Sequence, residues 1–173
     1  MAKRERMTGL LLVAALSVLA SCGRGRGTAG PAQIGAPAPT FELDDLSGRR
    51  VTLEQYRGKV VLLDFWATWC TPCRRTMPVL ERLQKEFAGE LVLLAINLQE
   101  PAEEVRDYVI RRGIESTVLL DLDGRVGHAY RAQAIPMQVL IDRQGVVYDI
   151  LVGLSPTLER DLRAEIEKLI AAD

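Results

Sequence analysis

Histidine, cysteine and aromatic side chains are scarce in this sequence, and each shortage excludes a class of function. The 173 residues include one histidine and three cysteines. They are Cys22, Cys70, Cys73 and His128. Without other ligand types or a second chain, these four residues cannot form a histidine-rich zinc site or a four-cysteine metal centre. Aromatic residues make up 5% of the chain, too few for platforms that stack on bases or sugars. A net charge of −1 argues against nucleic-acid binding through bulk positive charge.

The N-terminal segment has the features of a secretory signal. Basic residues open the chain, and an apolar run of eleven residues follows at 10–20. A helix of that length is too short to cross a bilayer core of ~30 Å, so residues 1–21 are predicted to be a signal peptide. The run ends in the letters LASC at Cys22, which resembles a bacterial lipobox. We therefore expect cleavage before Cys22 and lipidation of that cysteine; a plain secreted protein or an uncleaved anchor is the alternative.

The next segment has little to bury. Residues 22–37 begin with the predicted lipidated cysteine and are rich in glycine, proline and alanine. Such a composition is typical of a flexible linker. The folded domain is then predicted to cover residues 38–173.

Within that domain, apolar strands alternate with amphipathic helices. This pattern predicts an α/β fold in which helices flank a central mixed sheet. His128 is expected on the surface of a short helix. The expected strands lie at 41–43 and 51–53, which form a hairpin, and at 59–66, 91–97, 117–120, 137–142 and 146–151; the expected helices lie at 72–88 and 101–112 and from Pro156, with Ser155 as cap.

The chemistry is concentrated in the cysteine pair at the start of the helix at 72–88. Cys70 follows a buried strand, where free N–H groups at a helix start lower the pKa of a thiol. Two residues separate it from Cys73, so one thiolate can attack a disulfide and the other can resolve the mixed disulfide. Pro72 suits the first turn of the helix. A structural disulfide or a metal half-site is the alternative; haem attachment is excluded because Arg74, not histidine, follows the pair.

Two residues elsewhere support a redox role. Asp64 lies inside an otherwise apolar strand, where desolvation should raise its pKa and make it a proton acceptor for Cys73. The alternative is a structural carboxylate whose hydrogen bonds are satisfied. Pro136 precedes a strand, so its peptide bond can be cis and leave a backbone edge open beside the dithiol. An ordinary trans turn is the alternative there.

The sequence DFWATWCTPC at 64–73 resembles that of TlpA/ResA-like membrane-tethered thiol-disulfide oxidoreductases of the thioredoxin superfamily. The resemblance extends over residues 35–173 through GAPAPTF at 35–41, Ile135-Pro136, and LID at 140–142 with Gly145. It implies a thioredoxin-like fold with an N-terminal hairpin and a strand–helix insertion at about 98–128. It also implies attack by Cys70, resolution by Cys73 and a cis peptide bond at Pro136. The residues implied to contact substrate are Trp69, Thr71, Pro72, Ile135 and Pro136.

One departure from the family concerns cytochrome c maturation. Members with that role often carry a glutamate three residues after the second cysteine, where this chain has Thr76. Many of them also have asparagine at the position of Asp64, whereas thioredoxin has aspartate. Asp64 is thus similar to the acid–base group of thioredoxin, whereas the rest of the sequence is similar to TlpA. A role in cytochrome c maturation therefore stays only one alternative.

Together these features predict an extracytoplasmic, membrane-tethered lipoprotein that reduces disulfides of client proteins. No bound cofactor, metal or nucleic acid is expected, and the protein is expected to be a monomer. Its electrons are expected to come from a membrane thiol-disulfide donor. The alternatives are a dithiol oxidase, or a copper-site assembly factor that binds metal through Cys70 and Cys73.

Overall fold

The apolar segment after the predicted hairpin forms β3 (Val60–Trp66), which is buried along its whole length. A strand covered on both faces is expected to be apolar throughout. The computed structural model describes residues 30–172, so the predicted signal peptide and Cys22 lie outside the described residues. The other strands are β1 (Glu42–Asp45), β2 (Arg50–Thr52), β4 (Leu91–Leu98), β5 (Thr117–Asp121), β6 (Met137–Ile141) and β7 (Val147–Val152).

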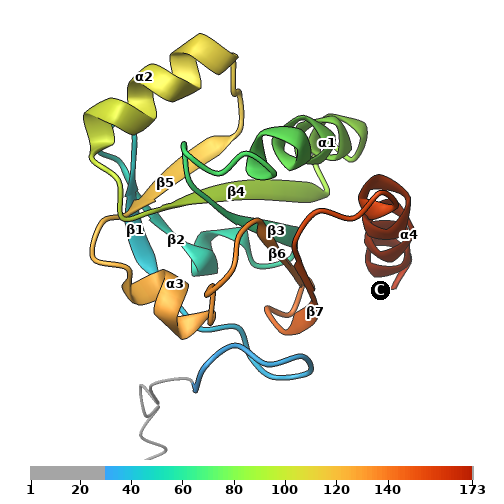
Figure 1. Cartoon of the computed structure of the whole chain (residues 1–173). Helices are drawn as coiled ribbons and strands as arrows, with labels where there is room; N and C mark the ends of the chain where they lie inside the picture. The colour runs from blue at the N-terminus through green and yellow to red at the C-terminus, as the bar shows by residue number, and fades with distance from the viewer. Residues whose placement is uncertain (1–29, 173) are drawn as a thin grey trace, which may run out of the picture.

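These strands form one seven-stranded sheet in the order β2-β1-β5-β4-β3-β6-β7 (Figure 1). Strands β3, β4 and β5 are parallel to one another, whereas the pairs at both edges are antiparallel. The predicted mixed sheet and N-terminal hairpin are confirmed. The helices of the domain are η1 (Leu53–Tyr56), which is a 3-10 helix, and α1 (Cys73–Glu86), α2 (Ala102–Arg112), α3 (Arg125–Ala129) and α4 (Leu158–Ala171).

The helices divide between the two faces of the sheet. Leu80 and Leu83 of α1 pack with Leu162 and Ile166 of α4 against one face, and Val105 of α2 packs on the same face nearer the cysteines. The other face is covered by α3, η1 and the N-terminal segment, whose residues share one apolar cluster with β3 and β6. Both faces of the central strands are therefore buried. In Figure 1, α1 and α3 lie on opposite sides of the sheet.

The folded region begins earlier than the composition predicts. Residues 32–38 pack against the domain, although they fall largely within the predicted linker. Ala32 is 5% exposed and its N–H donates to the carbonyl of Ala129 at 2.8 Å, and the Gly35 N–H donates to the carbonyl of Val147 at 2.8 Å. Their partners lie far along the chain, and small residues without periodicity give no local sign of such contacts. The linker range of 22–37 is therefore corrected at its C-terminal end.

The last helix begins later than predicted. Helix α4 starts at Leu158 with Thr157 as its N-cap, not at Pro156. The Ser155 hydroxyl instead accepts the N–H of Thr157 at 3.2 Å, within the turn before the helix. The predicted and observed ends of a helix commonly differ by one or two residues. Here the side chain expected to cap the helix closes the preceding turn instead. Among residues 30–172, no helix has the length and apolar character needed to cross a membrane.

Candidate active site

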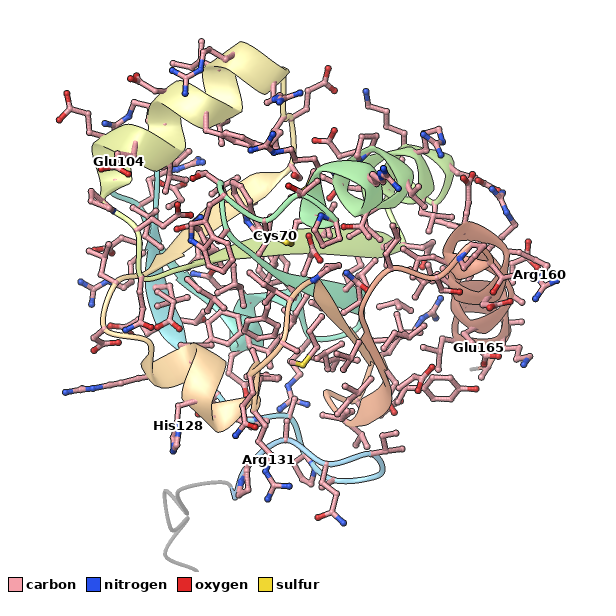
Figure 2. The ribbon with its side chains drawn as sticks, viewed as in Figure 1. Cys70, Glu104, His128, Arg131, Arg160 and Glu165 are labelled. Atoms are coloured by element: carbon pink, nitrogen blue, oxygen red, sulfur yellow. A yellow bond between two sulfur atoms is a disulfide. The ribbon has the colours of Figure 1, made fainter. Side chains whose placement is uncertain are left out.

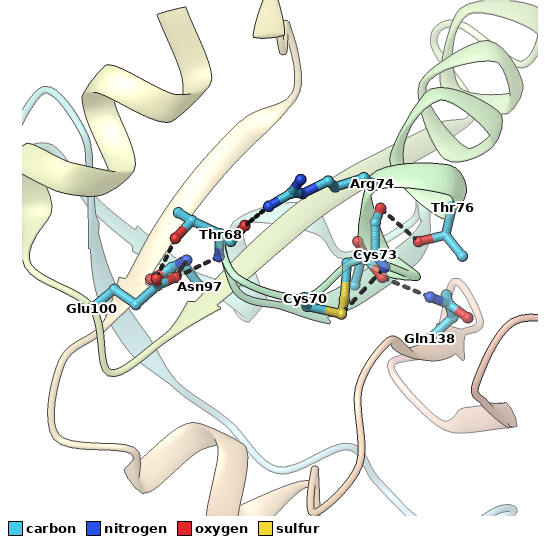
Figure 3. Close-up of a disulfide and its surroundings, with 9 residues drawn as sticks. Thr68, Cys70, Cys73, Arg74, Thr76, Asn97, Glu100 and Gln138 are labelled. Atoms are coloured by element: carbon cyan, nitrogen blue, oxygen red, sulfur yellow. Dashed lines mark hydrogen bonds between the residues drawn. A yellow bond between two sulfur atoms is a disulfide. The ribbon is translucent and has the colours of Figure 1, made fainter. Parts of the chain in front are cut away.

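The two cysteines lie where β3 passes into α1. Cys70 precedes the helix and Cys73 is its first residue, and a disulfide of 2.05 Å joins their sulfur atoms (Figure 3). The N–H of Cys73 points at the Sγ of Cys70 at 3.2 Å. A helix N-terminus that donates to one sulfur of a pair favours negative charge on that sulfur. The geometry therefore distinguishes Cys70 from Cys73 as the site of a stabilised thiolate.

In this oxidised state the two cysteines have nearly the same solvent exposure. Cys70 is 3% exposed and Cys73 is 2% exposed, so both are buried. Trp69, directly before Cys70, is 69% exposed, and Thr71 directly after it is also exposed. The buried disulfide thus lies beneath a rim of exposed side chains. A partner that approaches the sulfur of Cys70 must contact this rim.

Asp64 faces the same side of the sheet as the cysteines. Alternate residues of a strand point to the same face. Leu62 packs with the inner face of α1, and Trp66 packs in the cluster that contains Cys70 and Cys73. Asp64 lies between these two residues on β3, so its carboxyl group projects toward the first turns of α1. This placement puts Asp64 on the side of the sheet from which it could accept the proton of Cys73, the role that the sequence analysis predicts.

The carboxyl group of Asp64 is fully buried and has one hydrogen bond. Gln138 Nε2 donates to Asp64 Oδ1 at 2.6 Å, while Asp64 Oδ2 has no partner among the described residues. Burial raises the pKa of Asp64 to about 7, and the hydrogen bond from Gln138 opposes that rise. Thr76 is also buried, but its hydroxyl donates to the carbonyl of Cys73 at 3.1 Å. Of Asp64 and Thr76, therefore, only Asp64 can accept a proton near neutral pH.

The segment before β6 lies at the same end of the sheet. Met137 pairs with Phe65 of β3, which brings the preceding Ile135 and Pro136 to the end of β3 from which the cysteine loop begins. The peptide bond between Ile135 and Pro136 is cis, as predicted. Ile135 packs against the cluster that contains both cysteines. The predicted site residues of this segment and of the cysteine loop therefore lie together.

A buried carboxylate that the sequence analysis missed holds the cysteine loop in place. Glu100 is 7% exposed and accepts three hydrogen bonds: from Thr68 N at 2.7 Å, from Thr68 Oγ1 at 2.5 Å and from Asn97 Nδ2 at 2.6 Å (Figure 3). Thr68 lies two residues before Cys70. Glu100 thereby ties the loop that carries Cys70 to the end of β4. A single glutamate after a strand gives no signal of such a contact, because its partners lie on another segment.

We expect Glu100→Gln to destabilise the protein. A glutamine presents an NH₂ group where the carboxylate accepts hydrogen bonds, so at least one buried donor loses its acceptor, at a cost of about 2 kcal/mol. For a domain of this size, that loss lowers the Tm by roughly 4–8 °C. Thermal unfolding measures it, with the exposed Glu103→Gln as a control that should leave the Tm unchanged. An unchanged Tm for Glu100→Gln would show that the three contacts contribute little.

The single histidine, the other residue considered as a metal ligand, lies apart from the cysteine pair. His128 is exposed on α3, well apart from Cys70 in Figure 2, as the sequence predicts for a surface residue of a short helix. Within the part of the chain that the structure describes, no three histidine, cysteine, aspartate or glutamate side chains are grouped so that they could hold a metal ion. Among residues 30–172, therefore, the cysteine pair is not part of a group of three such side chains.

Known proteins share this fold and site region. The AhpC/TSA family matches residues 34–150. Thioredoxin-like protein YneN of Bacillus subtilis is 36% identical over 138 residues, which cover 78% of this chain and 81% of YneN. Thiol-disulfide oxidoreductase ResA of Geobacillus thermodenitrificans is 36% identical over 137 residues, which cover 79% of this chain and 78% of that protein.

Solved structures agree with these sequence relatives. A crystal structure from Chlorobium tepidum, provisionally named as the thiol:disulfide interchange protein DsbE, is 32% identical and has a TM-score of 0.76. The similarity covers 80% of this chain and 99% of that one. The chain therefore belongs to the AhpC/TSA family, adopts the thioredoxin-like fold and is a thiol-disulfide oxidoreductase with a Cys70–Cys73 dithiol.

Proposed function

We propose that this protein reduces disulfides of extracytoplasmic client proteins, with Cys70 as the attacking thiol. The observation that carries the choice of Cys70 as the attacking thiol is the N–H of Cys73 directed at Cys70 Sγ, since it favours a thiolate on the first cysteine. The buried carboxyl group of Asp64 beneath the pair supports the reducing direction, because a negative charge nearby disfavours a stable thiolate. A less stable thiolate makes a dithiol a stronger reductant.

The reaction is two successive exchanges. The Cys70 thiolate attacks one sulfur of the client disulfide, forms a mixed disulfide and releases the other client sulfur as a thiolate. Cys73 then gives its proton to Asp64 and attacks the sulfur of Cys70, which releases the second client thiolate. The client gains two electrons, and the protein is left with the Cys70–Cys73 disulfide seen here.

Client contacts are proposed for the exposed rim around the sulfurs. Exposed Trp69 and Thr71 flank Cys70, and partly buried Ile135 packs beside the pair. These residues, with Pro72 and Pro136, would hold an extended client segment against the disulfide. A membrane thiol-disulfide donor would return the protein to its reduced form. The exchange needs no bound cofactor, and we propose that the protein acts as a monomer.

The reduction potential of the Cys70–Cys73 pair tests the direction of the reaction. A value near that of thioredoxin, ~−270 mV, is expected for a reductant, whereas a value near ~−120 mV would identify an oxidase. Equilibration with glutathione buffers of known ratio measures it. Reduction of insulin disulfides by the reduced protein is the matching activity assay, and a protein that only oxidises dithiols would contradict the proposal.

Membrane attachment is proposed to depend on Cys22. The lipobox-like sequence that ends at this residue supports lipidation there. We expect Cys22→Ser either to release the domain from the membrane or to leave the precursor uncleaved, because stable anchoring needs acyl chains on that residue. Membrane fractionation and the mass of the mature protein measure the effect. An unchanged mature mass together with unchanged fractionation would contradict lipidation of Cys22.

A further inference from the structure

Two buried oxygen atoms near the dithiol have no hydrogen-bond donor among residues 30–172. They are Oδ2 of Asp64 and Oε1 of Gln138, and both residues are 0% exposed. The two residues are direct register partners across β3 and β6, and Gln138 Nε2 donates to Asp64 Oδ1 at 2.6 Å. Unpaired oxygen atoms in a dry interior are unfavourable, so a pair of them on adjacent, bonded side chains needs an explanation.

One proton on Asp64 would satisfy both atoms. A carboxylic acid has one O–H donor and one free acceptor, and a primary amide offers the matching acceptor and donor. The protonated acid can donate from Oδ2 to Oε1 of Gln138 while the amide continues to donate to Oδ1. The ionised carboxylate keeps the bond from Nε2 alone. The same amide can thus hold either protonation state.

We propose that Gln138 is a positioning residue for proton transfer, whose amide holds the Asp64 carboxyl group in both its protonated and ionised forms. Asp64 then takes the proton of Cys73 while the same amide holds its carboxyl group. The inference rests on the proposed function, in which Asp64 is the proton acceptor. It extends that function to a residue of β6, two positions after Pro136.

The other groups that face Asp64 do not compete for this role. On the inner face of α1 only Cys73 titrates, since its other members are Thr76, Met77, Leu80 and Leu83. The facing positions of β4 are Leu93, Ala95 and Asn97, and the inner face of α4 is made of leucine and isoleucine. Glu100 lies beyond the end of β4 and is engaged by Thr68 and Asn97. Proton exchange therefore involves Asp64 and Cys73, with Gln138 as the neutral partner.

Gln138→Met tests the proposal, because methionine has a similar length but no hydrogen-bonding amide. The wild-type rate of insulin reduction should rise with pH through an ionisation near pH 7 that Asp64→Asn removes. Loss of the amide removes its bonds to both forms of the carboxyl group, so that ionisation should move away from its wild-type position by about one pH unit, and the rate at pH 7 should change with it. Gln133→Met, at an exposed glutamine, should leave the profile unchanged. In the Asp64→Asn background, Gln138→Met should not alter the profile.

The outcomes separate the two hypotheses. A wild-type ionisation that survives Asp64→Asn would overturn the role of Asp64 itself. An ionisation that Asp64→Asn removes but Gln138→Met leaves in place would overturn the role of Gln138 alone. Should Gln138→Met not fold, the infrared difference spectrum between wild type and Asp64→Asn at acidic pH decides instead. We expect the carbonyl band of a hydrogen-bonded acid; the band of a free acid would overturn the proposal.

Discussion

Cys73→Ser is expected to reduce catalytic turnover to the uncatalysed rate and to trap clients as mixed disulfides. The variant retains Cys70, with the helix N-terminus directed at its sulfur, so the first exchange can still occur. Serine cannot displace the client from Cys70, because a hydroxyl does not undergo thiol–disulfide exchange. Trapped species should appear on non-reducing gels and disappear on addition of a reductant.

Cys70→Ser is the matched control for this experiment. It also removes turnover, but Cys73 has no amide directed at its sulfur in the described structure, so we expect little trapping. Mixed disulfides that form through Cys73 in this variant, and not through Cys70 in Cys73→Ser, would reverse the proposed order of attack.

Asp64→Asn is expected to slow disulfide reduction by roughly 10- to 100-fold near neutral pH, at or below the low end for loss of a general base. The pKa of Asp64 is raised to about 7 by burial, so in the wild type a large fraction of this group can accept the Cys73 proton at neutral pH. Asparagine keeps the shape but cannot take the proton. A rate–pH profile of both proteins measures the effect, and Asp44→Asn, at an exposed position on β1, is the control. Equal profiles for wild type and Asp64→Asn would leave Asp64 as a structural carboxylate.

The same substitution should change how stability depends on pH. The folded-state pKa of Asp64, about 7, lies above the ordinary aspartate value of 3.8, so the folded protein holds a proton that the unfolded chain releases between these values. Wild-type stability should therefore fall as pH rises from about 4 to about 7, by an amount on the order of 4 kcal/mol. Asp64→Asn should lack this fall and be the more stable protein at pH 8. Thermal melts of both proteins at pH 5 and pH 8 check the sign.

The sequence predicted the parts of this protein whose signals are local. The strand at 60–66 is apolar throughout, and the helix that starts at Cys73 has apolar residues at helical spacing, so both could be predicted from pattern alone. Asp64 stood out because a carboxylate in such a strand is exceptional. Its placement toward α1 follows from strand alternation.

The features that were missed depend on contacts between distant segments. Glu100 becomes important only because Thr68, on another loop, donates to it twice. Gln138 is an unremarked residue in β6 until the register places it opposite Asp64. No periodicity or local motif encodes these pairings, since each is determined by how the sheet assembles.

If the protein is anchored at Cys22 as proposed, the packing of residues 32–38 limits how far the domain can work from the lipid surface. With lipid attached at Cys22 and the chain fixed to the domain from Ala32 onward, ten peptide units separate the two, and they extend to at most about 35 Å. A linker that continued to residue 38 would reach about 55 Å. Since the domain itself is about 35–40 Å across, client disulfides would have to come within roughly 70 Å of the bilayer to meet the dithiol. Substrate choice would then depend on height above the membrane as well as on the chemistry of the client.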